Sequence, residues 1–335
     1  MVALAAAFGL AAGAGLAGSG GPAGAAEALD LRISHQWMAG NDTRDGATRE
    51  FARFVEARDP AIRFRVYPGR SLIANPVAQL DALQAGTLEM AVYPPAMAAA
   101  RAPELAITAM PGTVTSLSQA RRLRQGPFRR ALQEVASAHG FRLLTWWWAP
   151  GAFIGRSRPL DGPESVRGLA LRSMEPGFAA LLAAAGAEVR RLPLAEVAAA
   201  FRAGALDGAL MPVEAMLAFR LYEVAGHLTL AEDWAPSMQL LPLVIATPAW
   251  EALGAERQAL FAAAADHADD WFHAAQEALL ARAAAAFRSA GASVAAPAPD
   301  AREAWTDLAR RRVWPDFAGS VPGGSQWLAL TRDPP

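Results

Sequence analysis

Arg172 is the residue whose type and position point most clearly to chemistry. It ends a short apolar segment, 168–173, that reads as a strand, and a charge there is not needed for solubility. A guanidinium can hold a carboxylate through two parallel hydrogen bonds, which fixes orientation as well as adding binding energy. We therefore expect Arg172 to bind a carboxylate ligand. The alternative is an ion pair with a structural acid such as Glu175 or Glu214.

Residue patterns typical of catalysis are absent from the sequence. The histidines are scattered, and His267 and His273 do not have the i, i+4 spacing of a metal pair on a helix. There is no G-x-S-x-G elbow, no H-E-x-x-H motif, no phosphate loop and no cysteine. We expect a binding protein without catalytic residues, metal or cofactor, and not an enzyme.

The elements that must position Arg172 alternate between strand and helix over residues 159–212. Parallel strands joined by crossover helices are expected from this rhythm. In such sheets the ligand lies beyond the carboxyl ends of the strands, where Arg172 and Met211 stand. The expected strands cover 168–173, 188–192 and 207–211, with a helix over about 194–203 that ends at Gly204.

The first part of the chain repeats this rhythm, which predicts a β-α-β-α-β unit of the doubly wound kind. A helical pattern from Pro248 to Gly291, with a break at Gly254, covers roughly 40 residues or about 60 Å. A helix of that length can brace two domains. The expected strands of the first part cover 29–35, 62–67 and 89–92, and its helices 47–58 and 77–85.

Three consecutive tryptophans end a predicted strand over 141–148. Side chains alternate along a strand, so we expect at least one of the three to face solvent or a ligand cleft. They can form an aromatic wall of a pocket, or they can fill a core.

Composition limits the class of protein. The 335 residues suffice for two domains, 53% of them are hydrophobic, and the net charge of −1 gives no field that would recruit nucleic acid. Residues 1–28 are rich in Ala, Leu and Gly and resemble a signal peptide or leader. We therefore expect an exported, soluble protein in the periplasm.

The segment around Arg172 is similar to the solute-binding subunits of tripartite ATP-independent periplasmic (TRAP) transporters of the dicarboxylate-binding type. The likeness rests on SVRGLALR, residues 165–172, and on the stretch from Glu196-Val197 to Asp207-Gly208. It extends to the helix 51–55, to Val66-Tyr67-Pro68, to 83–90 and, downstream, to 222–225 and 250–253.

This resemblance implies an α/β fold of the two-lobe periplasmic-binding-protein type. Each lobe has a mostly parallel sheet flanked by helices, and crossing strands and a long bracing helix join the lobes. We expect lobe I to comprise 29–150 plus about 237–275, and lobe II 151–236 plus about 276–335. The resemblance also implies that Arg172 grips the carboxylate of a small organic acid and that a monomer delivers it to the permease subunits of a TRAP transporter. A binding subunit for a sensor or another permease is an alternative, and a hydrolase or lyase a further one.

Two departures from the family pattern alter the expected pocket. Many members carry a second arginine about twenty residues before the first, where this chain has Gly151-Ala152-Phe153, with Arg156 and Arg158 displaced from that place. A polar residue often follows the Asp-Gly pair, whereas here Ala209-Leu210-Met211 follows it. We therefore expect a monocarboxylate with an apolar or aromatic body. The predicted ligand-binding residues are Arg172, Trp147, Trp148, Phe153, Tyr93, Trp37, Asn41, Glu175, Met211, Glu214, Trp234 and Arg156.

Overall fold

A computed structural model describes residues 28–332 of the chain. The predicted signal peptide lies almost wholly outside these residues. Within the described part, no helix is both long enough and apolar enough to span a membrane.

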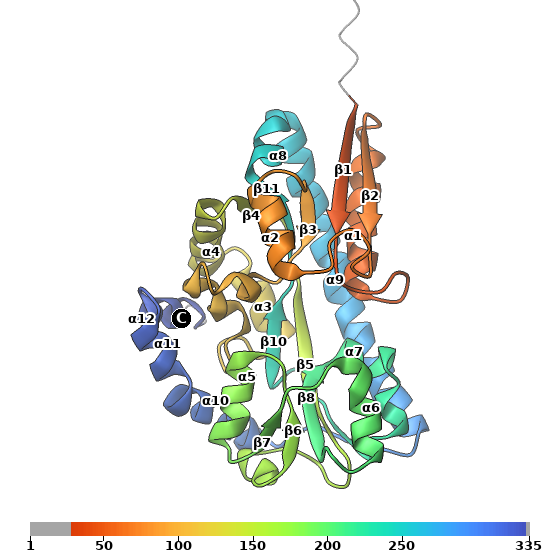
Figure 1. The fold of residues 1–335 in the computed structure, drawn as a ribbon, viewed down its shortest axis with the longest axis vertical. Helices are drawn as coiled ribbons and strands as arrows, with labels where there is room; N and C mark the ends of the chain where they lie inside the picture. Colours follow the sequence, from red (N-terminus) through yellow and green to blue (C-terminus); the bar gives the residue numbers. More distant parts are fainter. Residues whose placement is uncertain (1–27, 333–335) are drawn as a thin grey trace, which may run out of the picture.

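Lobe I is built on a five-stranded sheet with the order β2-β1-β3-β11-β4. β1 pairs in parallel with β2 and β3, and β11 runs antiparallel to β3 and β4. The carboxyl ends of the parallel strands point towards lobe II (Figure 1). The strands are β1 (Leu29–Ser34), β2 (Ile62–Tyr67), β3 (Met90–Val92), β4 (Phe141–Leu143) and β11 (Leu243–Ala246).

Helices cover both faces of the lobe I sheet. On α1, Phe51 and Val55 are buried one helical turn apart, and the Asp42 side chain caps the helix by accepting from the backbone N–H of Arg44. Phe51 meets Phe261 of α9 (Gly254–Ser289) edge to face, with 5.4 Å between ring centroids. The elements of this part are α1 (Thr43–Glu56), α2 (Pro76–Gln84), η1 (Pro95–Ala98), η2 (Pro103–Ala109), α3 (Leu117–Leu123), α4 (Pro127–Ala138) and α8 (Thr247–Ala252).

Lobe II is built on a seven-stranded sheet. Six strands follow the order β12-β9-β5-β8-β6-β7, and the seventh, β10, pairs with β5. β6 is parallel to β7 and β8, whereas β5 is antiparallel to β8, β9 and β10. The strands are β5 (Trp148–Gly155), β6 (Ala170–Arg172), β7 (Glu188–Arg190), β8 (Gly208–Pro212), β9 (His227–Thr229), β10 (Ser237–Leu240) and β12 (Ser293–Ala295).

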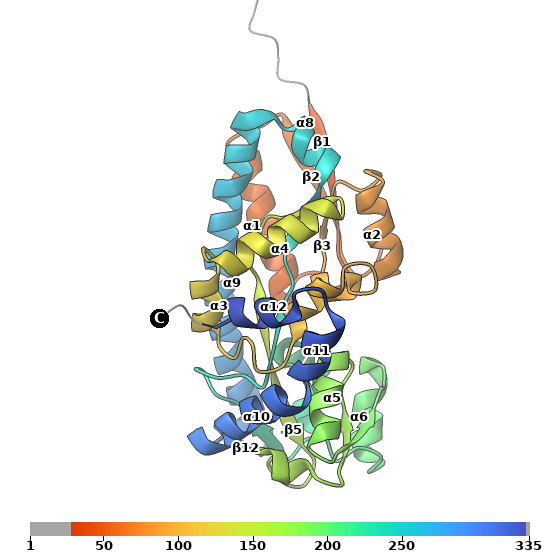
Figure 2. The same ribbon diagram turned by 90° about the vertical axis from the view of Figure 1, so that its left-hand side faces the viewer.

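The helices of lobe II flank this sheet, and the last three helices run along one side of the molecule (Figure 2). Trp305 of α10 stacks on Phe153 of β5, with 5.2 Å between ring centroids. The elements are η3 (Pro163–Val166), α5 (Pro176–Ala184), α6 (Leu194–Arg202), α7 (Val213–Ala218), η4 (Leu221–Glu223), α10 (Pro299–Arg312), α11 (Trp314–Ser320) and α12 (Gly324–Leu330).

Helix α9 and the paired strands β5 and β10 connect the two lobes. Helix α9 (Gly254–Ser289) has 36 residues and runs along both lobes (Figure 2). At 1.5 Å per residue it is about 54 Å long. The predicted break lies at Gly254, whose φ of +72° favours glycine. The predicted bracing helix and the α/β two-lobe architecture are therefore confirmed. The sheets are mixed rather than mostly parallel, because in each of them antiparallel pairings are as many as parallel ones.

The predicted strand over 141–148 is wrong in its extent. β4 ends at Leu143 and β5 begins at Trp148, so the chain between them is irregular as it passes from one sheet to the other. The apolar run 238–247, which by its pattern reads as one strand, is likewise divided, into β10 and β11, which belong to different sheets. A hydrophobic run alone does not show where a strand leaves one sheet and enters the next. The division of the chain between the lobes stays a prediction.

Candidate functional site

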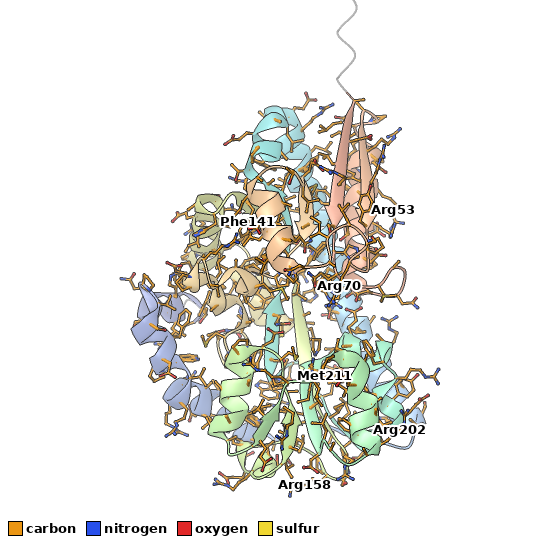
Figure 3. All side chains as sticks on the ribbon, in the orientation of Figure 1. Arg53, Arg70, Phe141, Arg158, Arg202 and Met211 are labelled. Atoms are coloured by element: carbon orange, nitrogen blue, oxygen red, sulfur yellow. The ribbon has the colours of Figure 1, made fainter. Side chains whose placement is uncertain are left out.

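The candidate binding site is a pocket at the edge of lobe II that faces lobe I, with about 320 Å³ of space that includes the open solvent at its mouth. Met211 lies at this edge, near the end of β8 (Figure 3). We call it the anchor pocket. Its lining residues come from β5, β6, α5, β8 and β10: Ala149, Gly151, Arg172, Ser173, Met174, Glu175, Phe178, Leu210, Met211, Pro212, Ser237 and Gln239.

Arg172 is the buried cation of the anchor pocket. It ends β6, as predicted, and only 5% of its surface is exposed. Its Nε donates to the backbone carbonyl of Leu192 at 3.2 Å. Burial lowers the pKa of Arg172, and the nearby charge of Glu175 opposes that shift. The guanidinium is therefore held in place through one nitrogen.

Arg172 has no ion pair with any acid in residues 28–332. Glu175 contributes only a longer-range attraction, and Glu214, the other acid considered from the sequence, bonds elsewhere. A buried charge without a partner is unfavourable unless a ligand or solvent compensates it. The remaining guanidinium nitrogens are thus available to a ligand that carries negative charge.

Of the predicted ligand-binding residues, the structure brings Glu175 and Met211 to the same pocket as Arg172. The other walls are largely apolar and include Phe178 and Leu210. Met174, beside Glu175 at the start of α5, is 42% exposed. The pocket thus combines one charged end with an apolar wall.

The three tryptophans do not line this pocket. All three are buried, with exposures of 5% for Trp146, 0% for Trp147 and 2% for Trp148, so none of them faces solvent. Trp147 stacks on Phe272 of α9, with 5.3 Å between ring centroids, in the core of lobe I. The side chains of the three tryptophans still alternate in direction, because Trp146 and Trp148 pack into a different core cluster from Trp147.

Trp148 and Trp146 line a second pocket, of about 350 Å³, beside the middle of α9. We call it the α9 pocket. Asp269 lies in its wall, accepts a hydrogen bond from the backbone N–H of Trp146 at 2.8 Å and forms an ion pair with Arg124 at 2.9 Å. Burial raises the pKa of Asp269 to about 7. The lining residues are Leu117, Ala120, Arg121, Arg124, Trp146, Trp148, Asp269, Asp270, Phe272 and His273.

Phe153 and Tyr93 lie in the core. Phe153 is fully buried against Trp305. Tyr93 is fully buried near Phe141, and burial raises the pKa of its hydroxyl to about 12. Both stand near the ends of strands, as the sequence indicates, but their rings point into the protein.

Glu214 connects the two lobes. It is buried at the start of α7, and its carboxylate accepts from the backbone N–H of Thr43 at 2.6 Å and from the Thr43 hydroxyl at 2.7 Å. Arg44 lies 3.3 Å away. Burial raises the pKa of Glu214. The negative carboxylate thus accepts a backbone hydrogen bond at the N-terminus of α1, where the helix dipole favours negative charge.

The remaining predicted residues lie apart from the anchor pocket lining. Trp37 is half-buried, and the guanidinium carbon of Arg44 lies over its ring, 4.4 Å from the ring centroid. Asn41 is exposed in a turn. Trp234 packs against the core from a loop.

Neither displaced arginine lies in the anchor pocket lining. Arg156 pairs with Asp207 at 3.3 Å. Arg158 lies at the end of lobe II opposite Met211 (Figure 3).

Sequence reasoning missed Ser237, Gln239 and Phe178. Ser237 and Gln239 belong to β10, far from Arg172 in the chain, and only the pairing of β10 with β5 brings them to the site. Their i, i+2 spacing on a strand places both on one face. That spacing is a signal only once β10 is known to lie beside the site. In the described part of the chain, no group of three or more His, Cys, Asp or Glu residues is placed to hold a metal ion.

Two α/β lobes joined by crossing strands and one long helix, with a pocket where strand ends meet, define a periplasmic-type solute-binding protein. Residues 33–319 match the family model of bacterial extracellular solute-binding protein, family 7, the DctP family. The chain belongs to this family. It is therefore a solute-binding protein of the TRAP type and not an enzyme, and it acts outside the cytoplasm.

The relatives agree with this assignment. A solute-binding protein of Albidiferax ferrireducens is 33% identical over 325 residues, which is 92% of each chain. The crystal structure of a TRAP periplasmic solute-binding protein from Rhodoferax ferrireducens with bound malonate has a TM-score of 0.82 and 32% identity, and covers 90% of this chain and 96% of that one. A Chromohalobacter salexigens protein with bound D-glucuronate shares the fold, with a TM-score of 0.79 at 19% identity, covering 90% of this chain and 99% of that one.

Proposed function

We propose that this protein captures a small organic acid by its carboxylate and delivers it to the membrane permease subunits of a TRAP transporter. Arg172 binds the carboxylate, and the apolar wall of the anchor pocket receives an apolar or aromatic body. The protein acts as a monomer. The observation that carries the proposal is a buried guanidinium that has no acidic partner among residues 28–332 and lines an open pocket.

The relatives support a carboxylate ligand. The Rhodoferax ferrireducens protein holds malonate, and a Pseudomonas aeruginosa protein of the same fold, at 19% identity, holds L-malate. Both ligands are dicarboxylic acids, so they support the carboxylate contact and not the apolar body. The choice between acids depends on the residues of this chain around Arg172, and these are mainly apolar.

The test is a thermal-shift screen of carboxylic acids, followed by calorimetry on the acids that raise the melting temperature. A ligand that binds only the native state raises its apparent stability. We expect Arg172→Ala to weaken binding of every such acid by at least about thirtyfold, because loss of one partner of a buried charge pair costs roughly 2–5 kcal/mol.

The matched control is Arg156→Ala, which removes an arginine of the same lobe that already pairs with Asp207. We expect this variant to bind like the wild type. Undiminished affinity of Arg172→Ala for a carboxylate would contradict the proposal.

A further inference from the structure

Ser237 occupies the space that a side chain at position 151 would need. Gly151 and Ser237 are paired residues of β5 and β10. A Cβ atom added at Gly151 would lie 2.1 Å from Ser237 Oγ and 2.9 Å from the backbone carbonyl oxygen of Met211, which are distances that real structures do not show. The strand that enters lobe II therefore has no room for a second ligand-binding arginine at this point.

Neutral polar groups face the anchor pocket instead. Ser237 is 7% exposed and Gln239 is half-buried, and both line the pocket from the same face of β10. Neither the Ser237 hydroxyl nor the Gln239 amide has a side-chain hydrogen bond to another residue in the described part of the chain. Their polar atoms are not among the buried ones that lack a partner, so they are accessible from the pocket and can bind a ligand in place of water.

The two polar ends of the pocket are well separated. β10 pairs with β5, β5 pairs with β8, and β8 pairs with β6, which carries Arg172. Across the sheet, three strand spacings of about 4.8 Å separate the backbones of Ser237 and Arg172. Along the strands they are staggered by three residues, because Ser237 is level with Pro212 and Arg172 with Ala209. The two backbones are therefore roughly 17 Å apart, and the long Arg172 side chain spans part of that distance. Between them lie Leu210 and Met211 of β8. The pocket is thus charged at one end, apolar in the middle and neutral but polar at the other end.

We propose that Ser237 and Gln239 determine specificity by binding a neutral hydrogen-bonding group, such as a hydroxyl, carbonyl or amide, at the end of the ligand remote from its carboxylate. This inference rests on the proposed function, in which Arg172 holds that carboxylate. The ligand is an elongated monocarboxylic acid with an apolar middle.

A second carboxylate at the far end is disfavoured. Among the residues that line the anchor pocket, only Arg172 and Glu175 are charged. A bound dicarboxylate would bring two negative charges to one cation and one existing anion. A serine hydroxyl and an amide serve a neutral group better, because a carboxylate loses more hydration on burial than they restore.

The experiment compares three acids of one shape by calorimetry: phenylacetate, 4-hydroxyphenylacetate and 4-carboxyphenylacetate. They differ only in the group opposite the carboxylate. We expect the wild type to bind the hydroxylated acid three- to tenfold more tightly than phenylacetate, the range of one net hydrogen bond, and the dicarboxylate more weakly than both. The double variant Ser237→Ala/Gln239→Leu should abolish the preference for the hydroxylated acid, so that it binds phenylacetate and 4-hydroxyphenylacetate with equal dissociation constants.

The control is Ser293→Ala, a serine exposed on β12 at the far edge of the same sheet, which should keep the wild-type preference. An unchanged preference in the double variant overturns the inference. Tighter wild-type binding of the dicarboxylate, or no binding of any of the three acids, also overturns it. These outcomes are distinct from failure of the proposed function, which appears as carboxylate binding that survives Arg172→Ala.

Discussion

Arg172 in the anchor pocket and Asp269 in the α9 pocket are two buried charges with opposite surroundings. Arg172 donates to one backbone carbonyl and has no ion pair within residues 28–332. Asp269 accepts from the backbone N–H of Trp146 and pairs with Arg124. Both charges are desolvated, but only Asp269 has an oppositely charged partner and a backbone donor within the fold, and these offset part of the cost of its burial.

This difference separates a binding site from a structural one. Charges that have partners within the fold hold the helices and strands around them in place, and removing one member of such a pair leaves the other buried without a partner. A charge that the fold leaves uncompensated lowers the stability of the free protein and adds to ligand affinity. Glu214 belongs with Asp269, since its carboxylate is fully engaged by Thr43 and Arg44.

The largest effect is expected from Glu214→Ala. The substitution leaves the Thr43 N–H and hydroxyl without their acceptor and Arg44 without one of its two acidic partners. We expect the free energy of unfolding to fall by about 3 kcal/mol, the low end for breaking a buried pair. Urea denaturation of the ligand-free protein measures it.

The control is Glu223→Ala, which breaks an exposed pair with Arg220 and should change stability by less than about 1 kcal/mol. Equal effects of the two substitutions would show that Glu214 is not a structural link between the lobes.

Asp269→Asn is expected to have a smaller effect that depends on pH. The pKa of Asp269 in the folded protein, about 7, exceeds that of an unfolded aspartate, about 4. The folded state therefore binds the proton more tightly, and the stability of the wild type falls as pH rises from about 4 to about 7. Asparagine keeps the acceptor for the Trp146 N–H but does not ionise. We expect the melting temperature of the variant, relative to that of the wild type, to rise as the pH increases from 4 to 8.

Asp266→Asn is the matched control on the same helix, because Asp266 is 72% exposed. It should show no comparable change relative to the wild type. A difference between Asp269→Asn and the wild type that stays constant from pH 4 to pH 8 would contradict the assigned cause.

The smallest effect is expected from Arg172→Met in the ligand-free protein. Methionine retains an apolar side chain of comparable length and removes the uncompensated charge, while the Leu192 carbonyl loses its donor. We expect a net gain of about 1 kcal/mol in the free energy of unfolding, since replacement of a buried charge by an apolar group is often stabilising. Urea denaturation without ligand checks this, and a loss of stability would mean that the fold does compensate Arg172.

Much of the fold follows from local sequence patterns. The strand 62–67 was predicted at the residues where it occurs, and the long helix with its break at Gly254 was also predicted. Hydrophobic periodicity and glycine at helix ends are local signals, which explains this success. The segment 141–148 was not predicted correctly, because a change of sheet depends on partners far away in the chain.

The residues of the candidate site could likewise be predicted only in part from the sequence. Arg172, Glu175 and Met211 could be identified because each lies at or near the end of a strand within one continuous stretch, and such ends meet at one edge of a parallel sheet. Tyr93 was chosen by the same reasoning, Trp147 from the run of three tryptophans and Phe153 from the place of the missing arginine, and all three lie in the core. Position near the end of a strand does not determine which way a side chain points.

The sequence by itself determined the family, the position of the buried cation and the absence of a second arginine before it. Only the tertiary structure decided what replaces that arginine. Ser237 reaches Gly151 because β10 pairs with β5, and this contact joins residues that are far apart in the chain. Hydrogen bonding between distant strands depends on the whole sheet, so no local pattern of residues encodes it.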